Sequence, residues 1–337
     1  MKRVIAILVV SILIMIGGGY AIFYYTYKSG CVTESRMLYV TDKMTLAVLE
    51  SELSQSIGEK GASRVIDLIN IKGIDITKRT GAYMINVGDS PADIVGRLQR
   101  REQTPIKFTF NNVRTKGELA DIIGERLMMS GEDILVVLNN DSICAAYGCD
   151  TATIVTLFMP DTYELYWNVS PERLLTIMGN YYNNWWSDER KAKANALGLT
   201  PAEVATLASI VEQESNKRDE RPMVARLYLN RLNRGIKLQA DPTVKYALND
   251  FGLKRILNKH LKYDSPYNTY LYAGLPPAPI YLADKRTLDA VLNAPKHNYI
   301  YMCAKEDMSG YHNFTSSYSQ HLNNAKRYQR ELNRRGY

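Results

Sequence analysis

The chain of 337 residues contains only four cysteines and four histidines, and this shortage narrows the chemistry that it can perform. No two cysteines have the C-x-x-C spacing and no histidines have the H-E-x-x-H spacing, so the common zinc and redox sites have no support. We therefore expect neither a metal ion nor a cofactor. Cys144 and Cys149 are near enough in sequence for a small disulfide in an oxidising compartment, and two free thiols are an equal alternative.

Internal repeats, low-complexity stretches and a glycine-rich phosphate loop are also absent, so the sequence favours neither a repeat architecture nor a P-loop nucleotide site. The net charge is +7, with a pI of about 9.0. Such a charge can serve nucleic-acid binding, but the basic residues are scattered, with modest clusters only at 326–327 and 330–335. We expect no nucleic-acid partner. A solvated C-terminal helix, or attraction to anionic lipid headgroups or acidic wall peptides, accounts for these clusters.

One long run without charged residues extends from 4 to 27, and it is long enough to span a bilayer. The run exceeds the apolar part of a usual signal peptide and has no clear A-x-A cleavage site, and Lys28 does not suit a lipobox before Cys31. We therefore predict an uncleaved transmembrane signal anchor at 4–27, with a tail at 1–3 and a linker at 28–36. Basic residues on the two sides of the run nearly balance, so charge alone does not set its orientation.

The rest of the chain is typical of the α+β class and divides into two parts. A small α+β module is predicted at 37–110, with short strands near 38–40 and 83–86 and a helix from Ser90 to about Arg100. A larger mixed α+β domain is predicted at 111–337.

The larger domain is expected to begin after a strand at 107–110, with a capping box at Thr115 and Glu118 that opens a helix. Residues 130–150 are expected to be loop and short helix, and residues 170–197 to be helical. The latter segment is rich in aromatic residues, among them Trp185 and Trp186. Such residues could line a sugar-binding cleft, but at helical spacing they more often pack between helices.

Glu214 lies at the end of the best-signalled helix in the chain. Thr200, Pro201 and Glu203 form a capping box with proline at the first helical position. Apolar residues then recur with the helical period, and Glu214 falls on that stripe, whereas Glu212 falls at its edge. Burial and the helix C-terminus should both raise the pKa of Glu214, which would suit a general acid. The alternative is an ordinary solvated or paired carboxylate.

The segments after this helix could build a binding cleft. A second helix is expected from about 220 to 234, and Gly235 ends it. Polar and aromatic loops follow at 238–243, 267–270 and 274–280. Their amide, hydroxyl and ring groups suit a sugar, because rings stack on its apolar faces and polar groups bond its hydroxyls.

At this point the chain resembles the YceG-like family of membrane-anchored endolytic murein transglycosylases. The resemblance rests on six segments in the family's order and on PDTY upstream of them, at 160–163. The six are ASIVEQES (208–215), NRL (230–232), LQADPT (238–243), YNTY (267–270), GLPPAPI (274–280) and HNF (312–314). Two small departures are Ala240, where threonine is common, and Ala278, where glycine often occurs; both bear on substrate fit.

The resemblance implies that Glu214 is the catalytic residue. One glutamate would protonate the glycosidic oxygen between N-acetylmuramic acid and N-acetylglucosamine, and then deprotonate the muramyl C6 hydroxyl to close a 1,6-anhydro ring. The substrate-binding or supporting candidates lie in or beside the same segments: Glu212, Ser215, Asn230, Arg231, Gln239, Asp241, Tyr267, Asn268, Tyr270 and His312. Glu212 could be an ion-pair partner of an arginine such as Arg231. Asn268 could bind an N-acetyl group or merely stabilise its loop.

The resemblance also implies a location and partners. It implies a cytoplasmic N-terminus, a catalytic domain on the outer side of the bacterial cytoplasmic (inner) membrane, and a LysM-like, glycan-binding character for 37–110. Peptidoglycan strands, the membrane and a penicillin-binding peptidoglycan synthase are the partners it implies. Two alternatives stay open: a lysozyme-like muramidase that uses Glu214 with Asp241, and a non-catalytic murein-binding scaffold for cell-wall synthases.

Overall fold

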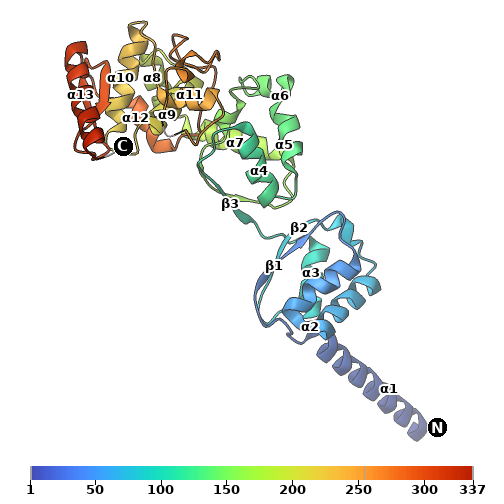
Figure 1. Cartoon of the computed structure of the whole chain (residues 1–337). Coiled ribbons are helices and arrows are strands. Elements are labelled where there is room, and N and C mark those ends of the chain that lie inside the picture. The colour runs from blue at the N-terminus through green and yellow to red at the C-terminus, as the bar shows by residue number, and fades with distance from the viewer. Residues whose placement is uncertain (1, 254, 336–337) are drawn as a thin grey trace. The chain divides into compact units, whose positions relative to one another are not determined.

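The computed structural model describes residues 2–253 and 255–335, and the chain divides into two compact units (Figure 1). Unit 1 comprises residues 1–108 with the short segments 126–128 and 163–169. Unit 2 comprises residues 109–125, 129–162 and 170–337. Helices and short two-stranded sheets occur in the chain, as expected for the α+β class.

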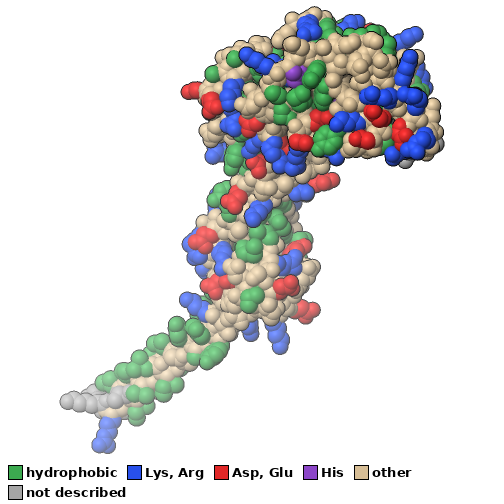
Figure 2. Space-filling model, turned by 90° about the vertical axis from the view of Figure 1, so that its left-hand side faces the viewer, with side chains coloured by type: hydrophobic (Ala, Val, Ile, Leu, Met, Phe, Trp, Pro, Cys, Tyr) green, Lys and Arg blue, Asp and Glu red, His purple; other side chains and the backbone are tan. Residues whose placement is uncertain are grey.

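The N-terminal helix of unit 1 is long, apolar and exposed. Helix α1 (Lys2–Phe23) continues into a π-helical turn, η1 (Tyr24–Lys28). The window Ile7–Lys28 has a mean hydropathy of 2.2 and no buried residue. Figure 2 shows hydrophobic side chains along this helix, whereas charged side chains are interspersed over the rest of the visible face. Its 22 residues would extend for about 33 Å, the thickness of a bilayer's hydrocarbon core. The helix therefore fits a single-pass membrane anchor.

The rest of unit 1 is a two-stranded sheet covered by helices. Strand β1 (Arg36–Val40) pairs antiparallel with β2 (Gly81–Ile85), so that Arg36 lies opposite Ile85 and Val40 opposite Gly81. Helices α2 (Leu46–Ile71) and α3 (Pro91–Arg100) pack together beside this sheet, and a short 3-10 turn, η2 (Ile76–Lys78), precedes β2. Helix α2 is kinked at Gly58, whose φ of 68° is a left-handed value that glycine adopts without steric cost.

The expected linker at 28–36 packs against unit 1. The backbone N–H groups of Cys31 and Val32 donate to the carbonyl oxygen of Asp89, at 2.9 and 3.3 Å. The Val32 side chain is only 4% exposed and belongs to the core of the unit. Asp89 is itself held by the Arg97 guanidinium, which lowers the pKa of the Asp89 carboxyl.

Unit 2 is mainly helical, with short strands at two places. The division of the chain into units falls within strands β3 and β4. From β3 onward the elements are, in order, β3 (Ile106–Phe110), α4 (Lys116–Arg126), α5 (Gly131–Leu138), α6 (Asp141–Ala146), η3 (Ile154–Leu157), β4 (Asp161–Leu165), α7 (Pro171–Trp185), α8 (Asp188–Ala196), α9 (Pro201–Glu214), α10 (Arg221–Asn233), α11 (Asp241–Ala247), η4 (His260–Lys262), α12 (Lys285–Leu292), β5 (Tyr301–Ala304), β6 (His312–Thr315) and α13 (Tyr318–Arg334). Strand β3 pairs with β4, and β5 pairs antiparallel with β6. Helix α9 is central, because it packs against α8, α10, α11 and α12 (Figure 1).

The structure corrects one local prediction for unit 2, the capping box at Thr115, and decides between the two alternatives for Cys144 and Cys149. The Thr115 hydroxyl caps α4 by accepting from the Glu118 N–H at 3.0 Å, but the Glu118 carboxylate accepts from the Arg114 N–H at 2.7 Å, one residue before the capping-box position. Of the two alternatives for Cys144 and Cys149, the structure has free thiols. The aromatic segment at 170–197 has the packing role that its helical spacing favours over a sugar-binding one. Trp186 is only 1% exposed and lies in the core of unit 2.

Candidate active site

Helix α9 fixes where Glu214 lies. The predicted capping box is formed: the Thr200 hydroxyl accepts from the Glu203 N–H at 3.2 Å, and the Glu203 carboxylate accepts from the Thr200 N–H at 2.8 Å. The helix ends at Glu214 because Ser215 takes an extended conformation, with φ of −134° and ψ of 123°. All residues from Val204 to Val211 except Ala205 are buried, so the helix cannot rotate to move its last residue.

The Glu214 carboxyl group has the properties expected of a general acid. Burial raises its pKa from the ordinary value of 4.5 to about 7, and the negative charge of Asp241 adds to this effect. The Tyr228 hydroxyl donates to Glu214 Oε1 at 2.9 Å and opposes the rise, as does the positive charge of Lys245. Near neutral pH the group is therefore present in both protonation states, which suits proton transfer in either direction.

Glu214 borders an open cleft of about 440 Å³ in unit 2. The cleft lies among α9, α10, the start of α11, strands β5 and β6, and the start of α13. Its lining residues are Glu214, Leu227, Tyr228, Arg231, Leu238, Gln239, Asp241, Tyr270, Tyr301, Met302, Cys303, Ala304, His312, Tyr318 and His321. The lining combines aromatic rings with hydrogen-bonding groups, a combination that suits sugar rings.

Asp241 brings a second carboxylate to the cleft. It is the first residue of α11, and its Oδ1 accepts from the Tyr270 hydroxyl at 2.6 Å. This contact joins two predicted site residues from separate segments. Burial and the Asp241 carboxylate together raise the pKa of the Tyr270 phenol, so the hydroxyl stays a donor at physiological pH.

Arg231 and Gln239 form another part of the wall. The buried Arg231 guanidinium donates to the carbonyl oxygens of Lys237 and Ile300, at 2.9 and 2.8 Å, and to the side-chain oxygen of Gln239. Its Cζ lies 6.0 Å from the centre of the Tyr301 ring. Arg231 thus fixes the loop after α10 against β5, and we interpret it as a residue that shapes the cleft.

His312 reaches the cleft from β6 and is fixed from behind by Glu220. The Glu220 carboxylate accepts from the backbone N–H of His312 and lies 2.7 Å from His312 Nδ1. The hydroxyl of Ser215 donates to the same carboxylate at 3.1 Å. Ser215 is buried and lies behind the cleft wall, so its contact supports the turn that follows Glu214.

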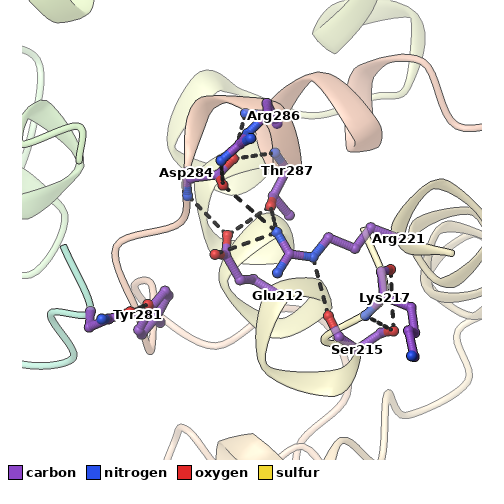
Figure 3. Close-up of polar contacts among 9 residues, drawn as sticks. Glu212, Ser215, Lys217, Arg221, Tyr281, Asp284, Arg286 and Thr287 are labelled. Atoms are coloured by element: carbon purple, nitrogen blue, oxygen red, sulfur yellow. Dashed lines mark hydrogen bonds and ion pairs between the residues drawn. The ribbon is translucent and has the colours of Figure 1, made fainter. Parts of the chain in front are cut away.

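Glu212 belongs to a different network, which corrects the predicted pairing with Arg231. Its carboxylate accepts from the backbone N–H of Asp284 at 2.9 Å and from the hydroxyl of Thr287 at 2.7 Å (Figure 3). Its ion-pair partner is the Arg221 guanidinium at 3.5 Å, whereas Arg231 is committed to carbonyl groups and Gln239. The network fixes α9 to α12. Helical phasing predicted different surroundings for the two glutamates, and only Glu214 lines the cleft, but phasing could not identify the partner of Glu212.

Three other predicted residues lie outside the cleft. The Asn230 amide donates to the carbonyl oxygens of His297 and Tyr299, at 2.7 and 3.0 Å. Asn268 is fully buried, and its amide donates to the carbonyl oxygens of two residues of the preceding loop, at 2.8 and 3.1 Å. Of its two predicted roles, the structure therefore supports the loop-stabilising one. The Tyr267 ring lies 4.7 Å from that of Tyr246 and lines a separate pocket.

Sequence reasoning missed several residues that line the cleft. Tyr228, whose hydroxyl contacts Glu214, was not among the candidates, although a tyrosine hydroxyl in a core requires a hydrogen-bond partner and this requirement was a usable signal. Tyr301 and His321 stack at 5.2 Å, and the Nδ1 atom of His321 is buried without a hydrogen-bond partner. Because these two residues belong to different elements, no local sequence pattern predicted that they would be in contact. Across residues 2–253 and 255–335, no group of three or more His, Cys, Asp or Glu side chains is arranged to hold a metal ion.

Comparison of the sequence with known families identifies the family of the chain. The YceG-like family matches residues 38–327, so the chain belongs to it. Relatives by sequence are an endolytic murein transglycosylase of Bacillus subtilis, 37% identical over 147 residues, and one of Streptococcus pneumoniae, 36% identical over 113 residues. These matches cover 44% and 32% of this chain, but only 38% and 20% of the relatives' lengths.

A solved structure of a putative YceG-like protein from Listeria monocytogenes has a similar fold. The comparison has a TM-score of 0.58 and covers 86% of this chain and 98% of that one, at 24% sequence identity. The similarity therefore extends over both units and supports the mixed helix-and-strand architecture.

Proposed function

We propose that this protein is a lytic transglycosylase that cuts the β-1,4 bond between N-acetylmuramic acid and N-acetylglucosamine inside peptidoglycan strands. The observation that carries this proposal is the Glu214 carboxyl, with a pKa of about 7, at the edge of a cleft suited to sugars. Two sequence relatives named endolytic murein transglycosylase support the substrate class.

One carboxyl group suffices for this reaction. Protonated Glu214 donates its proton to the glycosidic oxygen as the bond to the muramyl carbon breaks. The resulting carboxylate then removes the proton of the muramyl C6 hydroxyl, whose oxygen closes a 1,6-anhydro ring. The group ends protonated and ready for another cycle, and no water is consumed. The Tyr228 hydrogen bond orients the carboxyl through both steps, and the negative charge of Asp241 favours an oxocarbenium-like sugar.

The matched variants Glu214→Gln and Glu212→Gln test this assignment. Both remove one carboxylate from the last turn of α9, but only Glu214 borders the cleft. On uncrosslinked glycan, Glu214→Gln should abolish 1,6-anhydromuramyl ends, whereas Glu212→Gln should retain them and unfold at a lower temperature, because it weakens the contact with Arg221. Products from a folded Glu214→Gln protein would overturn the assignment.

A lysozyme-like hydrolase is the second candidate, because Asp241 places another carboxylate in the same cleft. In that reaction the new ends would be reducing muramic acid and each cut would add one water. Mass spectrometry of the digest separates the two, since an anhydro end is lighter than a reducing end by one water.

We propose that α1 and η1 anchor the protein in the bacterial cytoplasmic membrane, with the N-terminus inside and unit 2 outside. The length, hydropathy and exposure of the helix support the anchor. An enzyme so placed could cut strands as they are made, end their elongation and act beside a penicillin-binding synthase. Protease digestion of intact spheroplasts should remove unit 2; protection of unit 2 would reverse the orientation.

For the module at 37–110 we propose a LysM-like, glycan-binding role. In support, a shallow groove of about 530 Å³ follows the kinked helix α2 and is lined by Ser51, Ser54 and Ser63 among other polar residues. Filling the groove with Ser54→Trp should weaken co-sedimentation of the full chain with sacculi. Unchanged binding would leave the module as a spacer.

A further inference from the structure

A second, smaller pocket lies in unit 2, and part of its wall comes from the same helix ends as the cleft. A small pocket of about 80 Å³ is lined by Arg114, Gln213, Pro242 and Lys245, with Phe251 and Ile280. Gln213 directly precedes Glu214, and Pro242 directly follows Asp241, so the pocket and the cleft are both lined from the end of α9 and the start of α11. A ligand group attached to a sugar in the cleft could therefore reach it.

The small pocket carries positive charge that the protein itself leaves unpaired. The Arg114 Cζ atom lies 4.9 Å from the centre of the Phe251 ring, a cation–π contact that holds the guanidinium at the pocket. In the described part of the chain, neither Arg114 nor Lys245 forms an ion pair with a carboxylate. The nearby Glu118 carboxylate is occupied by the backbone N–H of Arg114, at 2.7 Å. A guanidinium beside an ammonium suits a carboxylate ligand, because the planar fork of an arginine can donate two hydrogen bonds to it.

Arg114 also borders a larger pocket of about 270 Å³, which extends the site. Its other walls include the rings of Tyr246 and Tyr267 and the side chains of Val155 and Leu282. The ammonium group of Lys116 reaches this pocket too, but it donates to Asn139 Oδ1 at 2.7 Å and to the carbonyl oxygens of Leu138 and Thr151. Lys116 is thus a structural cation. Arg114 lines both pockets, the small one, which has room for a carboxylate, and the larger one, which is partly apolar.

We propose that these two pockets bind the acidic peptide carried by the muramyl sugar, with a peptide carboxylate on Arg114 and small apolar side chains against Tyr246 and Tyr267. This inference rests on the proposed function, because it is the glycan in the cleft that brings the peptide to the site. The enzyme would then select strands that still carry peptides with free carboxylates. Tyr267, which the sequence offered as a substrate-binding or supporting residue, would then contact the peptide and not the sugar.

Three substrates test the proposal with the wild-type full chain. They are uncrosslinked glycan with free stem carboxylates, the same glycan with these carboxylates converted to amides, and glycan stripped of peptide. We expect KM to be lowest for the first and about 10-fold higher for the second, the effect of one charge-assisted contact. The third substrate lacks the stem carboxylates but exposes the lactyl carboxylate of the muramyl sugar, so it shows which of the two carboxylates is bound. Its KM should be close to that of the second substrate. Equal KM values for the first two substrates would overturn the proposal.

The variant Arg114→Gln tests which group is responsible, with Arg173→Gln as the matched control. Arg173 is an exposed cation on α7 that lines neither pocket. Arg114→Gln should raise KM for the free-carboxylate glycan to the value for the amidated one and leave kcat within about twofold. Arg173→Gln should keep the wild-type preference. A preference that survives Arg114→Gln, or an equal loss on all three substrates, would contradict the proposal.

The two proposals can fail separately. If Glu214→Gln retains product formation, the catalytic assignment is wrong, whatever Arg114 does. If Glu214→Gln is inactive but wild type treats free and amidated stems alike, only the peptide site is wrong. Should Arg114→Gln fold poorly, the comparison of substrates with the wild-type enzyme still decides the outcome.

Discussion

The raised pKa of Glu214 predicts how the stability of the protein depends on pH. In the unfolded chain this carboxyl has its ordinary pKa of 4.5, whereas in the folded protein its pKa is about 7. Between these values the folded protein binds the proton more tightly than the unfolded chain does. The free energy of unfolding should therefore fall as pH rises from 4.5 through 7, and this loss should be complete above pH 7.

The two pKa values give the size of the effect. They differ by about 2.5, which corresponds to about 3.4 kcal/mol at about 1.36 kcal/mol per pH unit. Water in the open cleft solvates part of the charge, so we expect about 2 kcal/mol. The variant Glu214→Gln cannot ionise, and its side-chain carbonyl can still accept from the Tyr228 hydroxyl. The free energy of unfolding of this variant should therefore not show the fall between pH 4.5 and pH 7 that Glu214 causes in the wild type.

The assay is urea unfolding of wild type and Glu214→Gln at pH 4 and pH 8, followed by tryptophan fluorescence; Trp185 and Trp186 report on unit 2. The two proteins should be similar at pH 4, and the variant should be more stable by about 2 kcal/mol at pH 8. Glu172→Gln, which removes an exposed carboxylate on α7, is the control and should show no such gain. A stability difference that is equal at the two pH values would refute the reasoning.

Three further variants probe the same cleft. Tyr228→Phe removes the hydrogen bond that lowers the pKa of Glu214, so the pH above which activity falls should rise by up to about one unit; an unchanged pH profile would contradict this. Asp241→Asn removes the charge that raises the same pKa, so the profile should move to lower pH with anhydro products retained; complete loss of cutting would favour the hydrolase instead. His321→Ala removes a ring that lines the cleft and stacks on Tyr301 at 5.2 Å, so KM should rise by up to about 10-fold with little change in kcat, and an unchanged KM would exclude a role of this ring in sugar binding.

The parts of the site that sequence predicts well are those fixed by local signals. The capping box at Thr200 and Glu203 sets where α9 begins, and the apolar period sets the direction of each later side chain. These two facts place Glu214 toward the cleft and Glu212 away from it. The raised pKa of Glu214 follows from that placement and is confirmed in direction.

The partners of these residues depend on contacts between distant segments, which no local pattern encodes. The Glu212 carboxylate bonds Asp284, 72 residues away, and its ion-pair partner is Arg221. A buried amide such as Asn268 looks the same in sequence whether it bonds a ligand or the backbone carbonyls of its own loop. Only the fold shows that the carbonyls are within reach.

Helix α2 was not predicted, and the reason is local. Its middle contains Ser54, Ser56, Gly58 and Gly61, residues of low helix propensity, so the helical pattern is interrupted there. The structure accommodates the interruption with a kink at Gly58, and packing against α3 stabilises the two halves.

Isotope labelling tests the central claim, that one carboxyl group cuts the strand without water, most directly. Uncrosslinked glycan would be digested by the wild-type protein in water enriched in oxygen-18, and the new muramyl ends would be analysed by mass spectrometry. The account predicts 1,6-anhydro ends without the heavy isotope, because the ring closes through the sugar's own C6 oxygen. Reducing muramyl ends that carry oxygen-18 would contradict it and would make the protein a hydrolase.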